Sequence, residues 1–405
     1  MKVLGIVAEY NPFHNGHLFH IEESKKICNA DCTVAVMSGN FTQRGEPAIV
    51  DKWTRTHQAL SNGIDLVIEL PTLYSISSAE NFAEGAIKIL SSLGIIDYLS
   101  FGSETSNLDY LFKIANILYT EPAKYKDLLH SELNKGLSFP KARSNALISY
   151  LNDANITNII NSPNNILGIE YIKSLYKFNS DIKPICIQRK EVGYNQLSTS
   201  DTFASASAIR NLILKNSSCI DRYLPASSYT LLKRIINNGT FINDLSEFDS
   251  IITYKIRTMS KEELKNIPEI SEGLENKLKE GATQYNTVYE ILDFVKSKRY
   301  TLNRLKRILL YILLNITKED MVIAKSITPY IRVLGFTSNG KKILSKISKR
   351  NPNVITSLKK FIDSNDNKDL NILLQKDIEA SNIYTIKYNE KPFSNLDFSQ
   401  KLITL

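Results

Sequence analysis

Short apolar runs alternate with helical patterns along the first half of the chain. The apolar runs predict buried strands over Val3–Val7, Cys32–Ser38, Asp65–Leu70, Tyr98–Phe101 and Lys183–Gln188. Apolar residues with helical spacing lie between them and predict helices over Gly16–Asn29, Asp51–Asn62 and Ser78–Leu93. Because strands that alternate with helices are joined by right-handed crossovers, we predict an α/β protein with a doubly wound parallel sheet.

The pattern becomes mainly helical beyond Arg210. Helices are predicted within Tyr229–Asn237, Glu262–Ile267, Gly273–Lys279 and Thr287–Leu314, and two helices joined around Pro140 are predicted within Ile117–Leu151. A strand over Ile331–Phe336 and the helix after it predict a small C-terminal α/β piece. We therefore expect an α/β domain over residues 1–215 and a mainly helical region over residues 216–405.

Charge separates the two regions. The net charge is +8 for the whole chain, −2 for residues 1–200 and +10 for residues 201–405. A basic second half favours a polyanionic partner, although a lysine-rich solvated surface gives the same count. The start of the chain is no secretion signal and no apolar run would cross a bilayer, so we expect a cytoplasmic protein without a membrane partner. The four cysteines lack paired zinc-ligand spacing, and no metal site is predicted.

Candidate chemistry begins where the first strand ends. A turn at Asn11-Pro12-Phe13 is followed by a helix start, so His14 and His17 project from the first helical turn on one face. The free N–H groups and the positive end of a helix attract phosphate, and Gly16 permits close approach of a nucleotide. The alternative is an ordinary helix start with a surface pair of histidines.

Three further positions lie at strand ends or helix starts. Gly102 follows a strand at the edge where parallel sheets bind ligands, and Asn164 opens a helix with an amide that can bond a base or ribose. Arg44 lies in a loop at the same edge. Each has a structural alternative: a turn glycine, a helix-capping asparagine, and a surface arginine paired with Glu46.

A second phosphate-binding pattern occurs at Ala204–Arg210. Ser205 and Ser207 precede a helix and offer hydroxyl and main-chain donors, while Arg210 supplies a planar fork for the β- and γ-phosphates. The basic cluster Lys296, Lys298, Arg299, Tyr300, Arg304 and Arg307 has an aromatic residue in its middle, which is typical of RNA binding. A solvated helix face is the alternative for that cluster.

These motifs resemble known ones. His14-Asn15-Gly16-His17 is similar to the HxGH signature of the nucleotidyltransferase superfamily, and Ala204–Arg210 is similar to its second signature, I-S-S-T-x-I-R. The second motif departs from that pattern at Ala204 and Ala206. Across residues 4–315 the chain resembles the bacterial tRNA(Met) cytidine acetate ligases, through GIVAEYNPFHNGHL, MSGNFTQRGEPAIVDKW, SPNNILGIEY and SKRYTLNRLKRILLYILL.

The resemblance implies a HUP-type Rossmann-like nucleotidyltransferase domain that uses ATP, with Mg²⁺, and acts through His14 and His17. Acetate would attack the α-phosphate, and the acetyl group would pass from acetyl-adenylate to N4 of the wobble cytidine of elongator tRNA(Met). The ATP site implied in this way comprises Val7, Ala8, Glu9, Tyr10, Asn11, Pro12, Phe13, His14, Asn15, Gly16, His17, Leu18, Phe19, His20, Gly102, Asn164 and Arg189, joined by Ser205, Ser207 and Arg210.

Two other functions fit parts of the sequence. An adenylyltransferase that makes a nucleotide cofactor from a small phosphorylated substrate would use the same fold, but it would not need the basic second half. An RNA-binding protein that keeps the fold as a scaffold would not need two phosphate-binding signatures.

Overall fold

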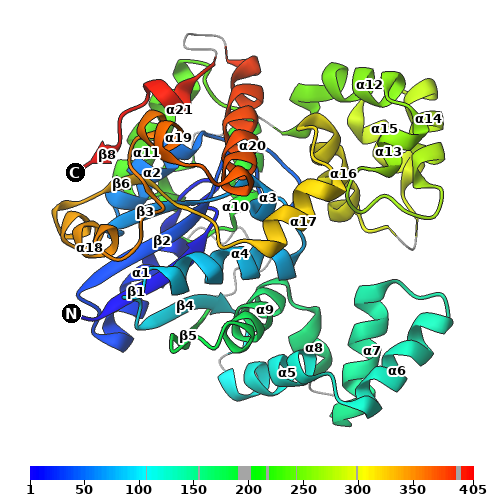
Figure 1. Cartoon of the computed structure of the whole chain (residues 1–405), viewed down its shortest axis with the longest axis horizontal. Helices are drawn as coiled ribbons and strands as arrows, with labels where there is room; N and C mark the ends of the chain where they lie inside the picture. Colours follow the sequence, from blue (N-terminus) through cyan, green and yellow to red (C-terminus); the bar gives the residue numbers. More distant parts are fainter. Residues whose placement is uncertain are drawn as a thin grey trace.

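The computed structural model describes residues 1–105, 107–153, 156–189, 202–215, 219–242, 244–297, 300–388 and 394–405. Within these ranges a central sheet of eight strands has the order β5-β4-β1-β2-β3-β6-β7, with β8 beside β6 (Figure 1). The strands are β1 Val3–Ala8, β2 Cys32–Ser38, β3 Leu66–Leu70, β4 Tyr98–Ser103, β5 Lys183–Gln188, β6 Ile331–Phe336, β7 Val354–Ile355 and β8 Ile403–Thr404. Strands β1 to β5 are mutually parallel, so the predicted Rossmann-like sheet is confirmed.

Both faces of the sheet are buried. Leu4 and Ile6 of β1 belong to one core, which α1 (Asn15–Cys28) and α2 (Lys52–Leu60) cover. Val3 belongs to the opposite core, with α4 (Ala79–Ser92) and α9 (Pro163–Lys177). Successive residues of a strand point to opposite faces, which explains the nearly continuous apolar runs in the sequence.

The C-terminal α/β piece is present and lies on the central sheet. Strand β6 pairs antiparallel with β3, and α18 (Ser338–Ser348) packs against β2, β3 and β6. Helix α20 (Lys368–Tyr384) packs against α3 (Thr72–Ser75) and α17 (Lys318–Ser326). Part of the region that we expected to follow the α/β domain therefore extends its sheet.

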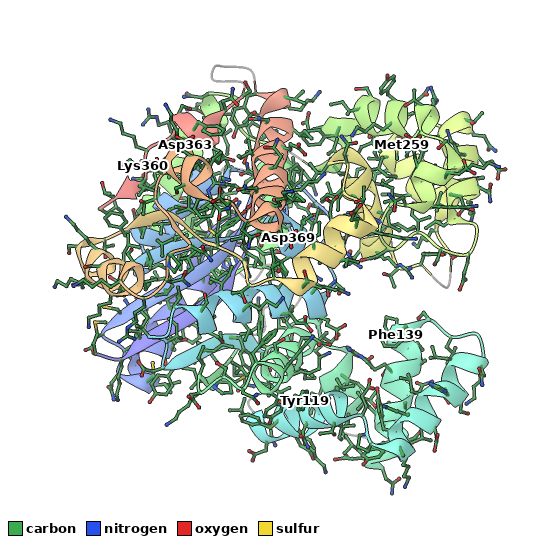
Figure 2. The ribbon with its side chains drawn as sticks, viewed as in Figure 1. Tyr119, Phe139, Met259, Lys360, Asp363 and Asp369 are labelled. Atoms are coloured by element: carbon green, nitrogen blue, oxygen red, sulfur yellow. The ribbon has the colours of Figure 1, made fainter. Side chains whose placement is uncertain are left out.

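Two groups of helices project on the same side of the sheet (Figures 1 and 2). The insert lobe comprises α5 Leu108–Thr120, α6 Ala123–Asn134, α7 Phe139–Leu151 and α8 Ile156–Asn161. The helical lobe comprises α12 Asp249–Thr258, α13 Lys261–Lys265, α14 Leu274–Gln284, α15 Val288–Val295 and α16 Leu302–Leu313. The remaining helices are α10 Ala206–Leu214, α11 Ala226–Asn237, α19 Leu358–Ser364 and α21 Leu396–Ser399, with short 3₁₀ turns at Asp221–Tyr223, Leu245–Phe248 and Thr385–Lys387.

Two predicted helix boundaries are wrong. Pro140 lies in the first turn of α7 rather than between two helices, because proline needs no N–H there. The predicted helix Thr287–Leu314 is two helices, since α15 ends at Val295 and Thr301 caps the start of α16. In the described part of the chain, no helix is long and apolar enough to span a membrane.

Candidate active site

Helix α1 begins directly after the turn, with His14 as its N-cap. Nδ1 of His14 accepts the Gly16 N–H at 3.0 Å, and Nδ1 of His17 accepts the His14 N–H at 3.2 Å. The two rings stack with their centroids 3.7 Å apart. Because Nδ1 of each ring is an acceptor, each neutral ring carries its proton on Nε2. The stacked rings therefore offer two Nε2–H donors at the positive end of the helix, while the N–H groups of Gly16, His17 and Leu18 are bonded to His14.

All three histidines of α1 resist protonation. Burial, with the charges of Arg189 and Arg210, lowers the pKa of His14 to about 3. Burial and His14 lower the pKa of His17 well below its ordinary value. Burial, followed by the Arg189 charge, lowers the pKa of His20 to about 4. The rings are neutral at physiological pH, so in the free protein they act as hydrogen-bond donors rather than as cations.

Three arginines lie near this helix start: the charges of Arg189 and Arg210 act on His14, and Arg44 and Arg210 meet at Ser207. The Arg44 Nη1 atom lies 3.3 Å from Ser207 Oγ, and Arg210 Nη2 lies 3.5 Å from the same oxygen. Partial burial lowers the pKa of Arg189; the Glu104 carboxylate opposes that shift and the Arg44 guanidinium adds to it. Three guanidinium groups gathered beside neutral imidazoles form a site suited to a polyanion.

The two sequence signatures are tied together by hydrogen bonds. Arg210 Nη1 donates to the carbonyl of Asn11 at 2.9 Å, and Asn15 Nδ2 donates to the carbonyls of Thr202 and Arg222 at 2.9 and 3.0 Å. Ser205 caps α10 by accepting the Ala208 N–H. The side chains of Asn15 and Ser205 thus hold the site together.

The other predicted ligand-binding positions lie beside this cluster. A Cβ on Gly102 would lie 3.3 Å from Arg189 Cγ, so the missing side chain makes room for that arginine. Asn164 Nδ2 donates to Glu104 Oε1 at 2.6 Å, and the other Glu104 oxygen accepts the Asn165 N–H. Glu104 thus caps the start of α9 and holds Asn164 at the edge of the sheet.

The remaining predicted residues of the first motif support the histidines or the core. The rings of Tyr10 and Phe13 contact His17, with centroids 5.0 and 5.5 Å away. His20 Nε2 lies 2.9 Å from Ser100 Oγ, and Phe19 packs edge-on against Phe203. Val7, Ala8 and Leu18 pack against the sheet cores, Pro12 is buried, and Glu9 Oε1 accepts the Gln43 N–H.

Comparison with known proteins agrees with this geometry. Residues 1–397 match the family described as HIGH Nucleotidyl Transferase. The tRNA(Met) cytidine acetate ligase of Thermoanaerobacter sp. is 46% identical over 408 residues, which cover 100% of both chains; that of Clostridium perfringens is 44% identical over 396 residues, 95% of each chain. The chain belongs to the tRNA(Met) cytidine acetate ligase family.

Solved structures of the family agree with this assignment. The chain is similar to Thermotoga maritima TmcAL in its apo form, with a TM-score of 0.95, and in a form bound with alpha-thio ATP, with a TM-score of 0.94. Both comparisons have 36% sequence identity and cover 100% of each chain. The family, the fold class and the ligase class predicted from the sequence are confirmed.

The predicted RNA-binding cluster of the ligase is less exposed than we expected. Tyr300 is buried, and its hydroxyl donates to the Ser271 carbonyl at 2.7 Å. Arg307 is also buried and pairs with Glu269 at 2.9 Å; Arg304 pairs with the same carboxylate at 3.5 Å. An exposed aromatic at Tyr300 is therefore a wrong expectation, because its ring closes the core of the helical lobe. Lys296 lies at the end of α15, and Lys298 and Arg299 lie outside the described residues.

The sequence analysis missed Arg55 as a positioning residue, and it named Glu46 only as a surface partner of Arg44. Arg55 is fully buried and donates to the carbonyls of Glu9 and Ser38 at 2.7 and 3.0 Å, and also to that of Gly39, so it fixes the ends of β1 and β2. Glu46 pairs with Arg210 at 3.4 Å and with Lys306 of α16 at 2.5 Å. Neither has a sequence signal, because their partners are distant carbonyls and a helix more than 200 residues away.

The described residues contain no cluster of three or more His, Cys, Asp or Glu side chains that would hold a metal ion. A Mg²⁺ ion at this site would therefore be bound mainly by the phosphates of the nucleotide, as is usual for that ion.

Proposed function

We propose that the protein is an ATP-dependent ligase that forms acetyl-adenylate from acetate and transfers the acetyl group to N4 of the wobble cytidine of elongator tRNA(Met). The observation that carries this proposal is the cluster in which Arg44 and Arg210 meet at Ser207 while the charges of Arg189 and Arg210 act on the neutral His14. Membership of the tRNA(Met) cytidine acetate ligase family supports the substrates. We propose that the reaction takes place in the cytoplasm, where ATP, acetate and tRNA are all present.

In the first proposed step, a carboxylate oxygen of acetate attacks the α-phosphorus, and the bond to the bridging oxygen breaks to release pyrophosphate. Negative charge gathers on the α-phosphate as the new bond forms. The Nε2–H groups of His14 and His17 are already oriented by their Nδ1 contacts, so they donate without reorganisation. The arginines bind the β- and γ-phosphates in a bidentate manner and stabilise the leaving group. Mg²⁺ bound to these phosphates would add to that stabilisation.

In the second proposed step, the exocyclic amine of the cytidine attacks the acetyl carbonyl carbon. The bond to the phosphate oxygen breaks, AMP leaves with the electron pair, and the amine loses a proton. An acyl-adenylate is already activated, so this step needs no nucleophilic side chain.

The purified protein incubated with ATP, labelled acetate and bulk tRNA tests the whole reaction. After nuclease digestion, we expect the label in N4-acetylcytidine. Adenylation of a small phosphorylated metabolite with no label in RNA would instead identify a cofactor-forming adenylyltransferase. RNA binding with no turnover of ATP would identify a scaffold.

His17→Ala tests the first step alone. We expect acetate-dependent exchange of labelled pyrophosphate into ATP, which reports the reversible first step, to fall by roughly 10²–10³, because one preorganised donor is lost from the charge-developing site. His130→Ala, at an exposed position on α6, is the control and keeps full activity. Circular dichroism establishes that both variants are folded. Undiminished turnover by His17→Ala would remove this histidine from the mechanism.

A further inference from the structure

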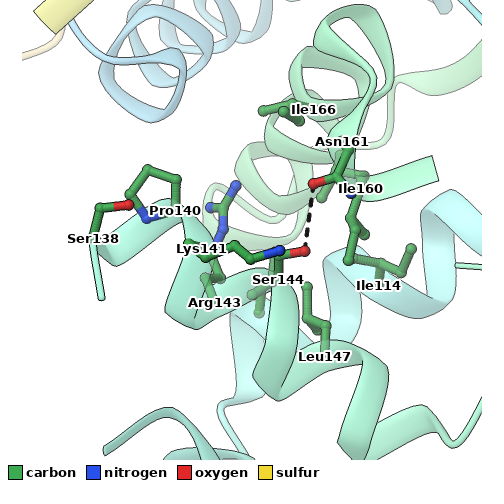
Figure 3. A pocket seen from close by; sticks show the side chains of 12 residues that line it. Ile114, Ser138, Pro140, Lys141, Arg143, Ser144, Leu147, Ile160, Asn161 and Ile166 are labelled. Atoms are coloured by element: carbon green, nitrogen blue, oxygen red, sulfur yellow. Dashed lines mark hydrogen bonds between the residues drawn. The ribbon is translucent and has the colours of Figure 1, made fainter. Parts of the chain in front are cut away.

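A cavity of about 270 Å³ lies in the insert lobe, between α5, α7, α8 and the first turns of α9 (Figure 3). No step of the proposed reaction uses it. Its walls are mainly aliphatic, formed by Ile114, Leu118, Leu147, Ile160, Ile166 and Ile169. This volume is below the range typical of drug-sized ligands and suits one flat ring system.

The cavity contains polar groups that are only weakly satisfied. Ser144 is buried, and its hydroxyl lies 3.4 Å from Asn161 Oδ1 (Figure 3), at the long limit for a hydrogen bond. Asn161 Nδ2 donates to the Thr157 carbonyl at 2.8 Å. A buried hydroxyl held this loosely can exchange its bond for one to a ligand, and it lies beside an amide oxygen that accepts. Together they provide a donor and an acceptor in an otherwise apolar cavity.

The mouth of the cavity is basic and aromatic. Lys141 is exposed, and Arg143 Nη1 donates to Glu170 Oε1 at 2.7 Å. Both side chains border the cavity. Phe139 lies between the lining residues Ser138 and Pro140 and is 56% exposed. In Figure 2 it is labelled at the edge of the insert lobe nearer to the helical lobe. An exposed aromatic residue with two cations within the next four positions is suited to stacking on bases and contacting phosphates.

The start of α9 links the cavity to the candidate active site. Asn161 and Ile166 line it, and Asn164, which lies between them in the first turn of α9, bonds Glu104 at the nucleotide-binding edge of the sheet. A nucleotide chain that enters the active site would therefore pass close to the cavity mouth.

We propose that this cavity holds one unstacked nucleobase of the RNA substrate, next to the base that is modified. The apolar walls sandwich the ring, Ser144 and Asn161 bond its edge, and Phe139 stacks on a neighbouring base. Lys141 and Arg143 contact the phosphates between them. This inference rests on the proposed function for the identity of the RNA. It adds a base-recognition site that the ATP chemistry does not require.

Two variants test the cavity separately. Phe139→Ala removes the exposed ring, and Ser144→Leu fills the cavity with aliphatic atoms. We expect each to weaken binding of an unmodified tRNA(Met) transcript roughly tenfold, as expected for the loss of one base stack. Both keep wild-type acetate-dependent exchange of labelled pyrophosphate into ATP in the absence of RNA. Phe398→Ala, an exposed aromatic on α21, is the matched control and binds the transcript normally.

A crosslink locates the contact directly. A transcript with 4-thiouridine at the uridines of its anticodon loop is irradiated with the wild-type protein, and we expect attachment within residues 138–147. Normal RNA affinity of both variants, or crosslinks only elsewhere, would overturn the inference. If free AMP or CMP prevents the crosslink within residues 138–147 while RNA binding is unchanged, the inference is also overturned. If the transcript binds through the cavity but is never acetylated, the proposed function fails and the base site stands.

Discussion

The chemistry of the site depends at the residue scale on which nitrogen of each histidine carries a proton. The main-chain N–H groups of Gly16 and His14 occupy Nδ1 of His14 and His17, so only Nε2 can donate. Protonation of Nδ1 would place two donors face to face and break the helix start. The same contacts that orient the rings therefore oppose their protonation, in agreement with the lowered pKa of each ring.

A pH profile tests the neutral state. The folded pKa of His14 is lowered from 6.5 to about 3, so the ring stays neutral well below the usual histidine range and protonates only in acid. We expect kcat/KM for ATP, measured by acetate-dependent pyrophosphate–ATP exchange without RNA, to be flat between about pH 6 and pH 8, because that parameter reports the free enzyme. His130→Gln, at an exposed histidine, gives the same flat profile. A step near the ordinary histidine pKa that disappears in His14→Gln would contradict neutral donors.

At the element scale, the loop after β2 joins the active site to the helical lobe. Thr42 N donates to the Glu46 carbonyl at 2.9 Å and Gly45 N to the Thr42 carbonyl at 3.0 Å, which makes a tight turn. Glu46 then pairs with Arg210 on one side and Lys306 on the other. Lys306, which lies within the basic stretch of the sequence, therefore points inward to the catalytic loop. The loop that carries Arg44 and pairs with Arg210 through Glu46 therefore depends on α16 for its position.

Gly45→Ala tests this dependence. Gly45 has φ +80°, and an added Cβ would lie 2.6 Å from the Arg307 main-chain nitrogen, so the substitution forces the loop away from α16. We expect a loss of about 2–3 kcal/mol in the free energy of unfolding by urea and a fall of at least tenfold in kcat/KM for ATP.

Gly136→Ala is the matched control for that experiment. Gly136 has φ +76° but no atom within 4 Å of the added Cβ, so it carries the backbone cost alone, about 1 kcal/mol. Its kcat/KM for ATP stays at the wild-type value. Equal effects of the two substitutions would show that contact with α16 does not position the loop.

Local patterns explain what the sequence could predict. The strands, the helix start at His14 and the cap at Ser205 depend on neighbours within a few residues, so periodicity and motif spacing identify them. The cation–carboxylate pairs depend on distant partners. Arg307 has the sequence context of an RNA-binding residue and is instead paired with Glu269, across a gap in sequence that no local pattern spans. The sequence alone indicates that Glu104 is a loop residue. Its role as a cap follows only from the position of α9 beside it.

At the scale of the whole molecule, a buried ion cluster joins the α/β domain to the C-terminal segment. Lys52 of α2 pairs with Glu69 of β3 and Asp397 of α21, each at 2.8 Å. Arg332 of β6 pairs with the same two carboxylates at 3.1 and 2.9 Å. All four side chains are at most 2% exposed. Burial opposes ionisation of Asp397, yet Arg332 and Lys52 hold its pKa at about 2, so its charge contributes stability above the unfolded pKa that is lost as pH falls toward 2.

Arg332→Met tests whether this cluster holds the C-terminal segment to the sheet. The substitution keeps a similar length but leaves two buried carboxylates with one lysine, and breaking a buried pair in this way typically costs about 3–5 kcal/mol. We expect that loss in the free energy of unfolding by urea.

Lys126→Met, which breaks an exposed pair with Glu121, is the control and changes the free energy of unfolding by less than about 1 kcal/mol. Because β6 lies beside β3 in the sheet that carries the candidate active site, we also expect acetate-dependent pyrophosphate–ATP exchange to be lost in the same urea transition as the fold. Equal stability of the two variants, or exchange activity that outlasts the C-terminal segment in urea, would show that this segment is a separate unit.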